Sequence, residues 1–311
     1  MKKREKGERV LISFDYALKR LLRNKANYAV LEGFLSELLM RDISVKTIGE
    51  SESNKEHPDD KYNRVDILVE AESDEILLIE LQFTPEIDYL HRMLYGTGKT
   101  ITERMVQGAK YLEVKKVYSI NIVYFDLGQG SDYVYHGRTH FTGLHIRDEL
   151  RLSKAQREAF GKETASDIYP EYYILKVNSF NDVAKDTLDE WIYFLKHNVI
   201  KEEFRARGLE KARKVLDRDN LSTEERKAYD YMLRLRSENL STIASSKLEG
   251  RIEGREEGRI EREKLAKELE KEREAREKER EAREKIAGEY EILLAEIARL
   301  KQNEHNSNTS S

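Results

Sequence analysis

The sequence predicts a mixed α/β domain, with elements in the order α-β-β-β-α-β, followed by a helical, coiled-coil-like C-terminal extension. Two observations support the domain: apolar residues recur at helical spacing over residues 14–41, and later runs are short, apolar and rich in β-branched residues. A third observation supports the extension. From about Ser246 the composition changes to Glu, Lys and Arg with few other residues.

The expected elements follow one another along the chain. The first helical region has a polar break at residues 24–27. Pro85 opens a second helix, because proline is tolerated in a first helical turn, and this helix runs to about Leu112. Residues 117–127 are the best candidate for a buried strand. The other strands are expected at 43–50, 64–71, 75–83, 132–136, 140–147 and 172–178, and later helices at 181–197, 201–218 and 222–240.

The charged extension is expected to be a long, exposed helix. Three Glu-Gly-Arg triplets begin at Glu249 and repeat every four residues. Each glycine costs a helix about 1 kcal/mol, whereas each i,i+4 ion pair contributes only ~0.2–0.5 kcal/mol. Apolar residues then return in steps of four and three, as in a short coiled coil: Ile286, Tyr290, Leu293, Ile297 and Leu300. We therefore expect a homo-oligomer, a dimer through this helix.

These features divide the chain into four segments. Residues 1–200 form the α/β domain, and residues 201–245 form a helical segment. Residues 246–301 form the charged helix and coiled coil, and residues 302–311 form a disordered tail.

Composition excludes several classes of site and partner. The 311 residues carry a net charge of −4, so no bulk positive field points to nucleic acid. The chain has no cysteine, which excludes disulfides, thiolate zinc sites and a cysteine nucleophile, and is typical of a cytoplasmic protein. The apolar run at residues 10–12 is too short for a signal peptide or a membrane span, so no membrane contact is expected.

Polar residues interrupt two strands that otherwise look buried: Asp66 in one, and Glu80 and Gln82 in the next. A buried carboxylate is costly unless something compensates it, and a divalent metal ion is one compensation. If the turn is an odd-length loop centred on Ser73, Asp66 faces Glu80, with Cβ atoms ~4.5–5.5 Å apart. A two-residue turn would instead pair Asp66 with Leu81.

Oxygen ligands from Asp66 and Glu80, with the backbone carbonyl of Leu81, suit Mg²⁺ or Mn²⁺, with Ca²⁺ as an alternative ion. Such an ion polarises a phosphoryl oxygen and lowers the pKa of a bound water. Gln82 can hydrogen-bond that water or a phosphate oxygen, but it cannot act as a base. No organic cofactor site is expected.

A simpler interpretation of the two carboxylates stays open. Asp66 and Glu80 would then lie at a sheet edge, in salt bridges to Arg64 or Lys61.

Two further motifs have simpler explanations. The segment 96–100 resembles the end of a phosphate-binding loop, but the full pattern requires glycine where Met93 stands. The histidines His136, His140 and His145 are expected to be ordinary hydrogen-bonded residues rather than a metal cluster.

The element order, with an Asp, a spacer and Glu-x-Gln, resembles the PD-(D/E)XK nuclease superfamily, which has a restriction-endonuclease-like core. More narrowly, it is similar to the bacterial recombination-promoting nuclease/putative transposase (Rpn-type) family. The resemblance spans roughly residues 10–260. The matching features are residues 14–19, 64–69, 79–82 and 108–111, Arg92 with Tyr95, the helix around Trp191 and the Glu-Gly-Arg repeats.

The resemblance implies a metal-dependent DNA endonuclease that hydrolyses phosphodiester bonds and is linked to DNA recombination and mobile elements. It implies that Asp66 and Glu80 bind the metal and that Gln82 replaces the superfamily's lysine. Glu37 is similar to a helical acid that some members add to the site.

Arg92 and Tyr95 are one helical turn apart, and they either meet the scissile phosphate or hold the helix against the sheet. A second hypothesis, from a different class, is a non-catalytic oligomeric interaction protein built on a degenerate nuclease scaffold. The presence of Asp66, Glu80 and Gln82 together argues against such decay.

Overall fold

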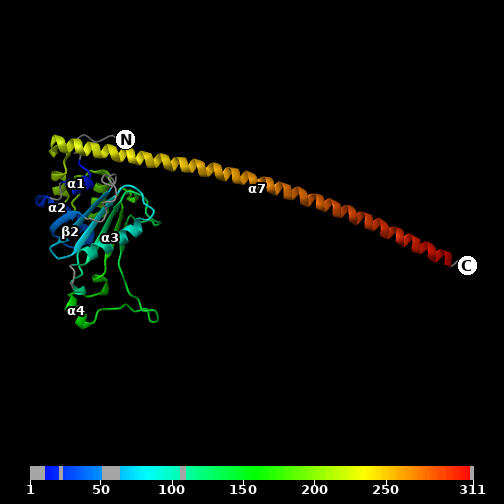
Figure 1. The fold of residues 1–311 in the computed structure, drawn as a ribbon, viewed down its shortest axis with the longest axis horizontal. Helices are drawn as coiled ribbons and strands as arrows, with labels where there is room; N and C mark the ends of the chain where they lie inside the picture. The colour runs from blue at the N-terminus through cyan, green and yellow to red at the C-terminus, as the bar shows by residue number, and fades with distance from the viewer. Residues whose placement is uncertain (1–10, 21–23, 51–63, 106–109, 309–311) are drawn as a thin grey trace. The chain divides into compact units, whose positions relative to one another are not determined.

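The computed structural model describes residues 11–20, 24–50, 64–105 and 110–308. The chain divides into two units, Met1–Leu240 and Ser241–Ser311. The first unit is a mixed α/β domain around a six-stranded sheet, and a long C-terminal helix begins in it (Figure 1). The predicted mixed α/β class and the predicted C-terminal helix are both confirmed.

The sheet has the strand order β1-β2-β3-β4-β6-β5. The first three strands pair antiparallel, β3, β4 and β6 pair parallel, and β5 lies antiparallel at the edge. Two parallel crossovers therefore follow an antiparallel meander. The strands are β1 (Val45–Glu50), β2 (Arg64–Ala71), β3 (Ile76–Gln82), β4 (Val117–Val123), β5 (Val134–Gly137) and β6 (Glu171–Lys176).

One predicted strand does not form. Residues 140–147 were expected to be extended, but this segment contains no strand and makes one isolated bridge, Thr142 to Glu149. Arg147 has a positive φ of 58°, and its backbone N–H donates to the carbonyl of Gly143, so the chain turns here. Because the chain turns, residues 140–147 do not run alongside a neighbouring strand.

The helices confirm most of the predicted helical regions. The polar break at residues 24–27 is a short 3-10 turn capped by the Asn24 side chain, which accepts a hydrogen bond from Ala26 N–H. The helix predicted to reach residue 112 ends earlier, at Glu103. The α-helices are α1 (Phe14–Arg20), α2 (Tyr28–Leu39), α3 (Tyr89–Glu103), α4 (Lys154–Phe160), α5 (Thr187–His197), α6 (Leu209–Val215) and α7 (Thr223–Asn308). The 3-10 helices are η1 (Lys25–Asn27), η4 (Tyr111–Glu113), η5 (Ala165–Asp167), η6 (Val177–Ser179) and η7 (Arg218–Asn220).

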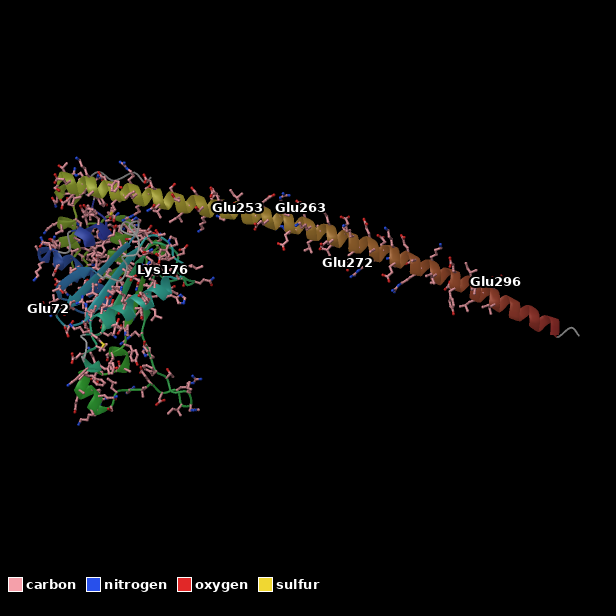
Figure 2. The ribbon with its side chains drawn as sticks, viewed as in Figure 1. Glu72, Lys176, Glu253, Glu263, Glu272 and Glu296 are labelled. Carbon is pink, nitrogen blue, oxygen red and sulfur yellow. The ribbon has the colours of Figure 1, made fainter. Side chains whose placement is uncertain are left out.

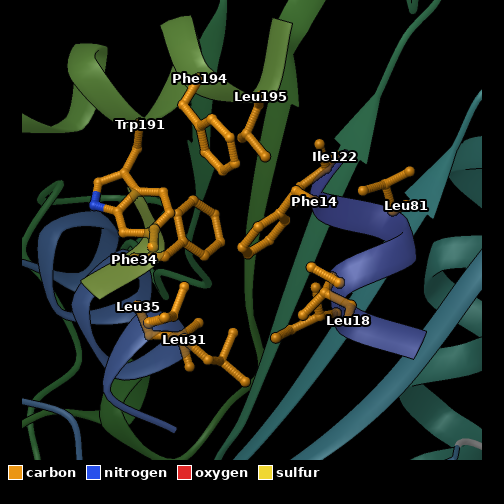
Figure 3. Close-up of a cluster of buried hydrophobic side chains, with 14 of the residues drawn as sticks. Phe14, Leu18, Leu31, Phe34, Leu35, Leu81, Ile122, Trp191, Phe194 and Leu195 are labelled. Carbon is orange, nitrogen blue, oxygen red and sulfur yellow. The ribbon is translucent and has the colours of Figure 1, made fainter. Parts of the chain in front are cut away.

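The two faces of the sheet carry different side chains, because successive residues of a strand point to opposite faces. On the first face, Ile79 and Leu81 join an apolar core with α1, α2 and α5. Phe14 lies at its centre, with ring centroids 5.4 Å from Phe34 and 5.9 Å from Trp191 (Figure 3). On the second face α3 covers the sheet through smaller apolar clusters. The first face therefore supplies most of the core.

The core of the first unit includes side chains from residues 201–245, which the sequence predicts to be a helical segment. Ala212, Leu216, Tyr229 and Met232 belong to this main core. Their apolar side chains are spaced among many charges, so composition alone did not reveal the buried stripe.

The second unit consists of the rest of α7, which continues to Asn308 and so includes residues that were expected to be disordered. Almost all of its described side chains are exposed (Figure 2). Ion pairs one turn apart, such as Arg276 with Glu272 at 2.7 Å, line the helix as predicted. Among the described residues, no helix combines the length and apolar composition needed to cross a bilayer.

The close approach of α2 to the segment before α6 requires glycine at position 33. A Cβ at Gly33 would lie 2.3 Å from the Arg207 carbonyl oxygen. We expect Gly33→Ala to lower the free energy of unfolding by about 1–3 kcal/mol through overpacking.

Gly98→Ala is the matched control, because nothing lies within 4 Å of a Cβ at Gly98 on α3. This change is expected to raise stability by about 0.5–1 kcal/mol through helix propensity. Denaturant titration of both variants checks the pair, and equal stabilities would contradict this description of α2.

Candidate active site

The β2–β3 hairpin sets the positions of the predicted site residues. Its register pairs Asp66 with Glu80, Val65 with Leu81 and Arg64 with Gln82. Of the two pairings that the sequence left open, the one with an odd-length turn is confirmed, and the pairing of Asp66 with Leu81 is wrong. For Asp66 the structure describes the backbone position, directly across the ladder from Glu80.

The alternative of an exposed sheet edge is also wrong. β2 lies between β1 and β3, and β3 lies between β2 and β4, so both strands are interior. Lys61, one of the two proposed salt-bridge partners, lies outside the described residues. Glu80 is 1% exposed and Gln82 is 2% exposed, so both polar side chains are inside the domain.

Asp66, Glu80 and Gln82 form a row of polar positions on β2 and β3, called here the polar row. The row continues into β4, where Asn121 pairs with Glu80 in the parallel ladder. Asn121 is fully buried; its amide donates to Ser119 Oγ at 2.9 Å and to the Tyr173 carbonyl oxygen at 3.3 Å. The Tyr89 hydroxyl, from α3, donates to Asn121 Oδ1 at 3.2 Å. Sequence reasoning missed Asn121, although it is an amide inside the most apolar strand.

Arg92 on α3 connects the polar side chains of β3. Its Nη2 lies 3.3 Å from Glu80 Oε2 and donates to Gln82 Oε1 at 3.3 Å. Its Nη1 donates to Glu86, and its guanidinium carbon lies 5.1 Å from the centre of the Tyr89 ring. The guanidinium therefore offsets the cost of burying the Glu80 carboxylate.

The side chain of Gln82 is held at both ends. Its Oε1 accepts from Arg92, while its Nε2 donates to Glu86 Oε1 at 2.7 Å and to the Thr84 carbonyl oxygen at 3.1 Å. Glu86 was also missed by sequence reasoning. It follows Pro85 and stands four residues after Gln82, outside the strand pattern.

Glycine allows α3 to approach this row closely. A Cβ at Gly96 would lie 3.3 Å from Glu80 Oε1 and 3.8 Å from Leu78 Cδ2. The helix therefore covers Glu80 directly, and a larger residue at position 96 would crowd the carboxylate.

The sequence of residues 12–246 matches the family model described as PD-(D/E)XK nuclease family transposase. The chain belongs to this family. Membership confirms the resemblance drawn from the sequence and indicates a nuclease or transposase-like role. No curated protein and no solved structure matches the chain.

The PD-(D/E)XK site candidates on helices are not all brought together. Arg92 points into the polar row, but Tyr95 is 65% exposed, although the two are one turn apart. Glu37 accepts hydrogen bonds from Thr187 Oγ1 at 2.5 Å and Arg207 N–H at 3.0 Å. Its helix α2 packs on the first face, so Glu37 does not join Glu80.

Two of the three histidines form hydrogen bonds, as predicted from the sequence, and His145 is exposed. His136 lies 2.7 Å from Glu171 and stacks on Tyr173, and His140 lies 3.0 Å from Glu149. Among the side chains that the structure describes, no three His, Cys, Asp or Glu residues are grouped as metal ligands. That set does not include the Asp66 side chain.

A cavity of about 660 Å³ lies away from the polar row, between the ends of α2 and α5 and strands β4–β6. The pKa of the Glu171 carboxyl, which lines this cavity, is lowered. Burial acts to raise this pKa, but the hydrogen bonds from Lys116 and His136 outweigh the effect of burial. Burial lowers the pKa of Lys116. Because its acids are engaged with neighbouring groups, we assign this cavity no part in the site.

The hydrogen bond from Tyr89 to Asn121 allows a test of how α3 packs on the second face of the sheet. Tyr89→Phe removes one hydroxyl that donates to a buried amide oxygen, so the free energy of unfolding should fall by about 0.5–1.5 kcal/mol. Tyr95→Phe, on the exposed side of the same helix, should leave it unchanged. Denaturant titration measures both, and similar losses in the two variants would contradict the assigned contact.

Proposed function

We propose that this protein is a metal-dependent DNA endonuclease that hydrolyses phosphodiester bonds and acts in recombination or on mobile elements. The supporting observation is the register that sets Asp66 opposite Glu80 in interior strands of a PD-(D/E)XK family member, next to Gln82. Two carboxylate positions facing each other across a ladder repel unless a cation is shared. Family membership supplies the reaction class.

The donor set fits a hard divalent cation. Glu80 and Asp66 provide carboxylates from adjacent strands, and Leu81 provides a backbone carbonyl between Glu80 and Gln82. We assign these three residues to Mg²⁺, with Mn²⁺ or Ca²⁺ as alternatives. When bound, the ion would polarise the phosphoryl oxygen and lower the pKa of a water molecule.

The protein's own side chains would orient the substrate and this water. Gln82 has no titrating group. Its amide, which is held by hydrogen bonds, would therefore orient the water and would not accept a proton from it. Arg92 places a positive charge against Gln82, where the wider superfamily has lysine. A guanidinium stays charged at any working pH and can form a bidentate pair of hydrogen bonds with a phosphate group.

The alternative, a non-catalytic interaction protein, is favoured by one observation. Glu80 is buried and already paired with Arg92, as in a structural salt bridge. In that case Glu80 and Arg92 would stabilise the domain, and no metal would bind.

Cleavage of supercoiled plasmid separates the two functions. With Mg²⁺ or Mn²⁺, we expect nicking that EDTA abolishes. Asp66→Ala and Glu80→Ala should each slow it by at least about 100-fold, equivalent to roughly 2.7 kcal/mol of lost transition-state stabilisation.

Glu37→Gln is the control, because its carboxylate is engaged by Thr187 and Arg207 and should not contribute. Cleavage that persists in folded Asp66→Ala, or in EDTA, would contradict the nuclease proposal.

We further propose that the protein forms a homodimer through the end of α7. The predicted seam residues Ile286, Tyr290, Leu293 and Ile297 are all exposed in the single chain, so their apolar surface is available to a second copy. Leu293→Asp should therefore convert a dimer to a monomer in sedimentation equilibrium.

Leu248→Asp is the matched control, since Leu248 and Leu293 are both 58% exposed on the same helix but Leu248 lies outside the seam. A wild-type monomer, or equal effects of the two changes, would contradict the proposed dimer.

A further inference from the structure

We infer that Arg236, near the start of α7, is a positioning residue for the proposed active site. By packing on Phe83, it fixes the end of β3 and therefore the position of Gln82. The inference rests on the proposed function for its catalytic consequence. Arg236 approaches from the face of the sheet opposite to Glu80.

A buried ion pair holds Arg236. Its Nη2 donates to Asp15 of α1, which is 2% exposed. Two charges are taken out of water here, and such a pair persists only where geometry and hydrogen bonding compensate the desolvation. Asp15 lies in the segment 14–19 that carries the family resemblance, yet the proposed chemistry gives it no role.

The guanidinium of Arg236 also packs against an aromatic ring. Its central carbon lies 3.7 Å from the centre of the Phe83 ring. A planar guanidinium can stack on a ring and pair with a carboxylate at the same time, whereas a lysine ammonium is a point charge with no plane to stack. Arg236 therefore ties Phe83 to Asp15.

Phe83 in turn joins the ends of two parallel strands. It follows Gln82, the last residue of β3, and its ring stacks on Tyr124 with centroids 4.3 Å apart. Tyr124 follows β4, and its N–H donates to the Gln82 carbonyl oxygen at 3.0 Å. Burial raises the pKa of Tyr124, so its hydroxyl stays protonated and donates to the Leu195 carbonyl oxygen at 2.9 Å.

This arrangement explains how a residue on the first face can act on the second. Successive residues of an extended chain point to opposite faces, so anchoring the Phe83 ring fixes the backbone from which Gln82 reaches Arg92 and Glu86. A shift of about 1 Å in a positioning group can cost roughly 100-fold in rate.

The support for Arg236 is itself well fixed. Tyr229, two turns earlier on α7, accepts a hydrogen bond from Ser13 N–H at 3.0 Å, and Tyr16 donates to the Glu225 carbonyl oxygen at 3.0 Å. The rings of Tyr16 and Tyr229 meet edge-on, with centroids 5.0 Å apart. The first turns of α7 are therefore bound to residues on both sides of Asp15, Ser13 just before α1 and Tyr16 within it.

The first test is the kinetics of folded full-length variants in the plasmid assay. Arg236→Ala should lower kcat by roughly ten- to 100-fold with little change in KM for DNA, because Arg236 is not in the polar row. Arg236→Lys, which retains the charge near Asp15 but not the stacking, should fall between. Arg234→Ala, an exposed arginine on the same helix, should match the wild type.

A double-mutant cycle asks whether Arg236 acts through Phe83. If it does, Phe83→Leu and Arg236→Ala should each lower kcat, and the double variant should be little worse than either. Multiplying effects, or a loss of thermal stability with kcat per folded molecule unchanged, would overturn the positioning role and leave a structural one.

Amide hydrogen exchange keeps this inference separate from the proposed function. In Arg236→Ala, exchange over residues 81–86 should rise at least about tenfold, while Arg234→Ala should not change it. If the wild type cuts no DNA, the nuclease proposal fails, and this measurement still decides whether Arg236 fixes the end of β3. Unchanged exchange over residues 81–86 would overturn the inference.

Discussion

The register of the β2–β3 hairpin is the constraint on which the rest of the site depends. Asp74 takes a left-handed conformation with φ of 65°, and its N–H donates to the Ala71 carbonyl oxygen at 3.0 Å, which closes the turn. Lys115 holds the turn from outside through Glu70 at 2.9 Å and Asp74 at 2.5 Å. A slip of one residue would turn Glu70 of β2 into the first-face core, which the apolar packing of that face forbids.

Given that register, the first face of β3 carries apolar core residues and the second face carries polar residues. The first face buries Leu77, Ile79 and Leu81 in the main core, and that burial supplies the stability needed to carry costly polar groups on the second face. Glu80 is then buried under α3 with Arg92 as its partner. The same pairing stabilises the domain and, under the proposed function, would also hold the Glu80 carboxylate in place for a metal ion.

The sequence predicted the features that depend on local periodicity, such as strand pairing. It did not predict the features that depend on how helices and strands pack against one another. Alternation reduced the partner of Asp66 to two candidates, Glu80 and Leu81, and the length of the turn in the structure decides for Glu80. Alternation did not give the rotation of α3 about its axis, which turns Arg92 inward and leaves Tyr95 exposed. Glu37 looked like a site acid, but the packing of α2 brings it to Thr187 instead. Asn121 contacts Tyr89 and Tyr173, which are distant in sequence, and Glu86 lies in the connection between β3 and α3, outside the strand pattern. Neither residue was therefore indicated by the alternation of apolar and polar residues.

The family resemblance implies that Gln82 stands in place of the superfamily's lysine, and the neighbours of Gln82 suit a neutral amide. Its amide accepts from Arg92 and donates to Glu86, so it needs both an acceptor and a donor. Lysine has donors only; at this position it could not accept from Arg92, and it would bring a second cation against the guanidinium. The positive charge near Glu80 comes from α3 instead of β3, and a neutral amide at position 82 is then the side chain that satisfies both partners. Glutamine at position 82 is thus compatible with the Arg92 arrangement and with the proposed nuclease function.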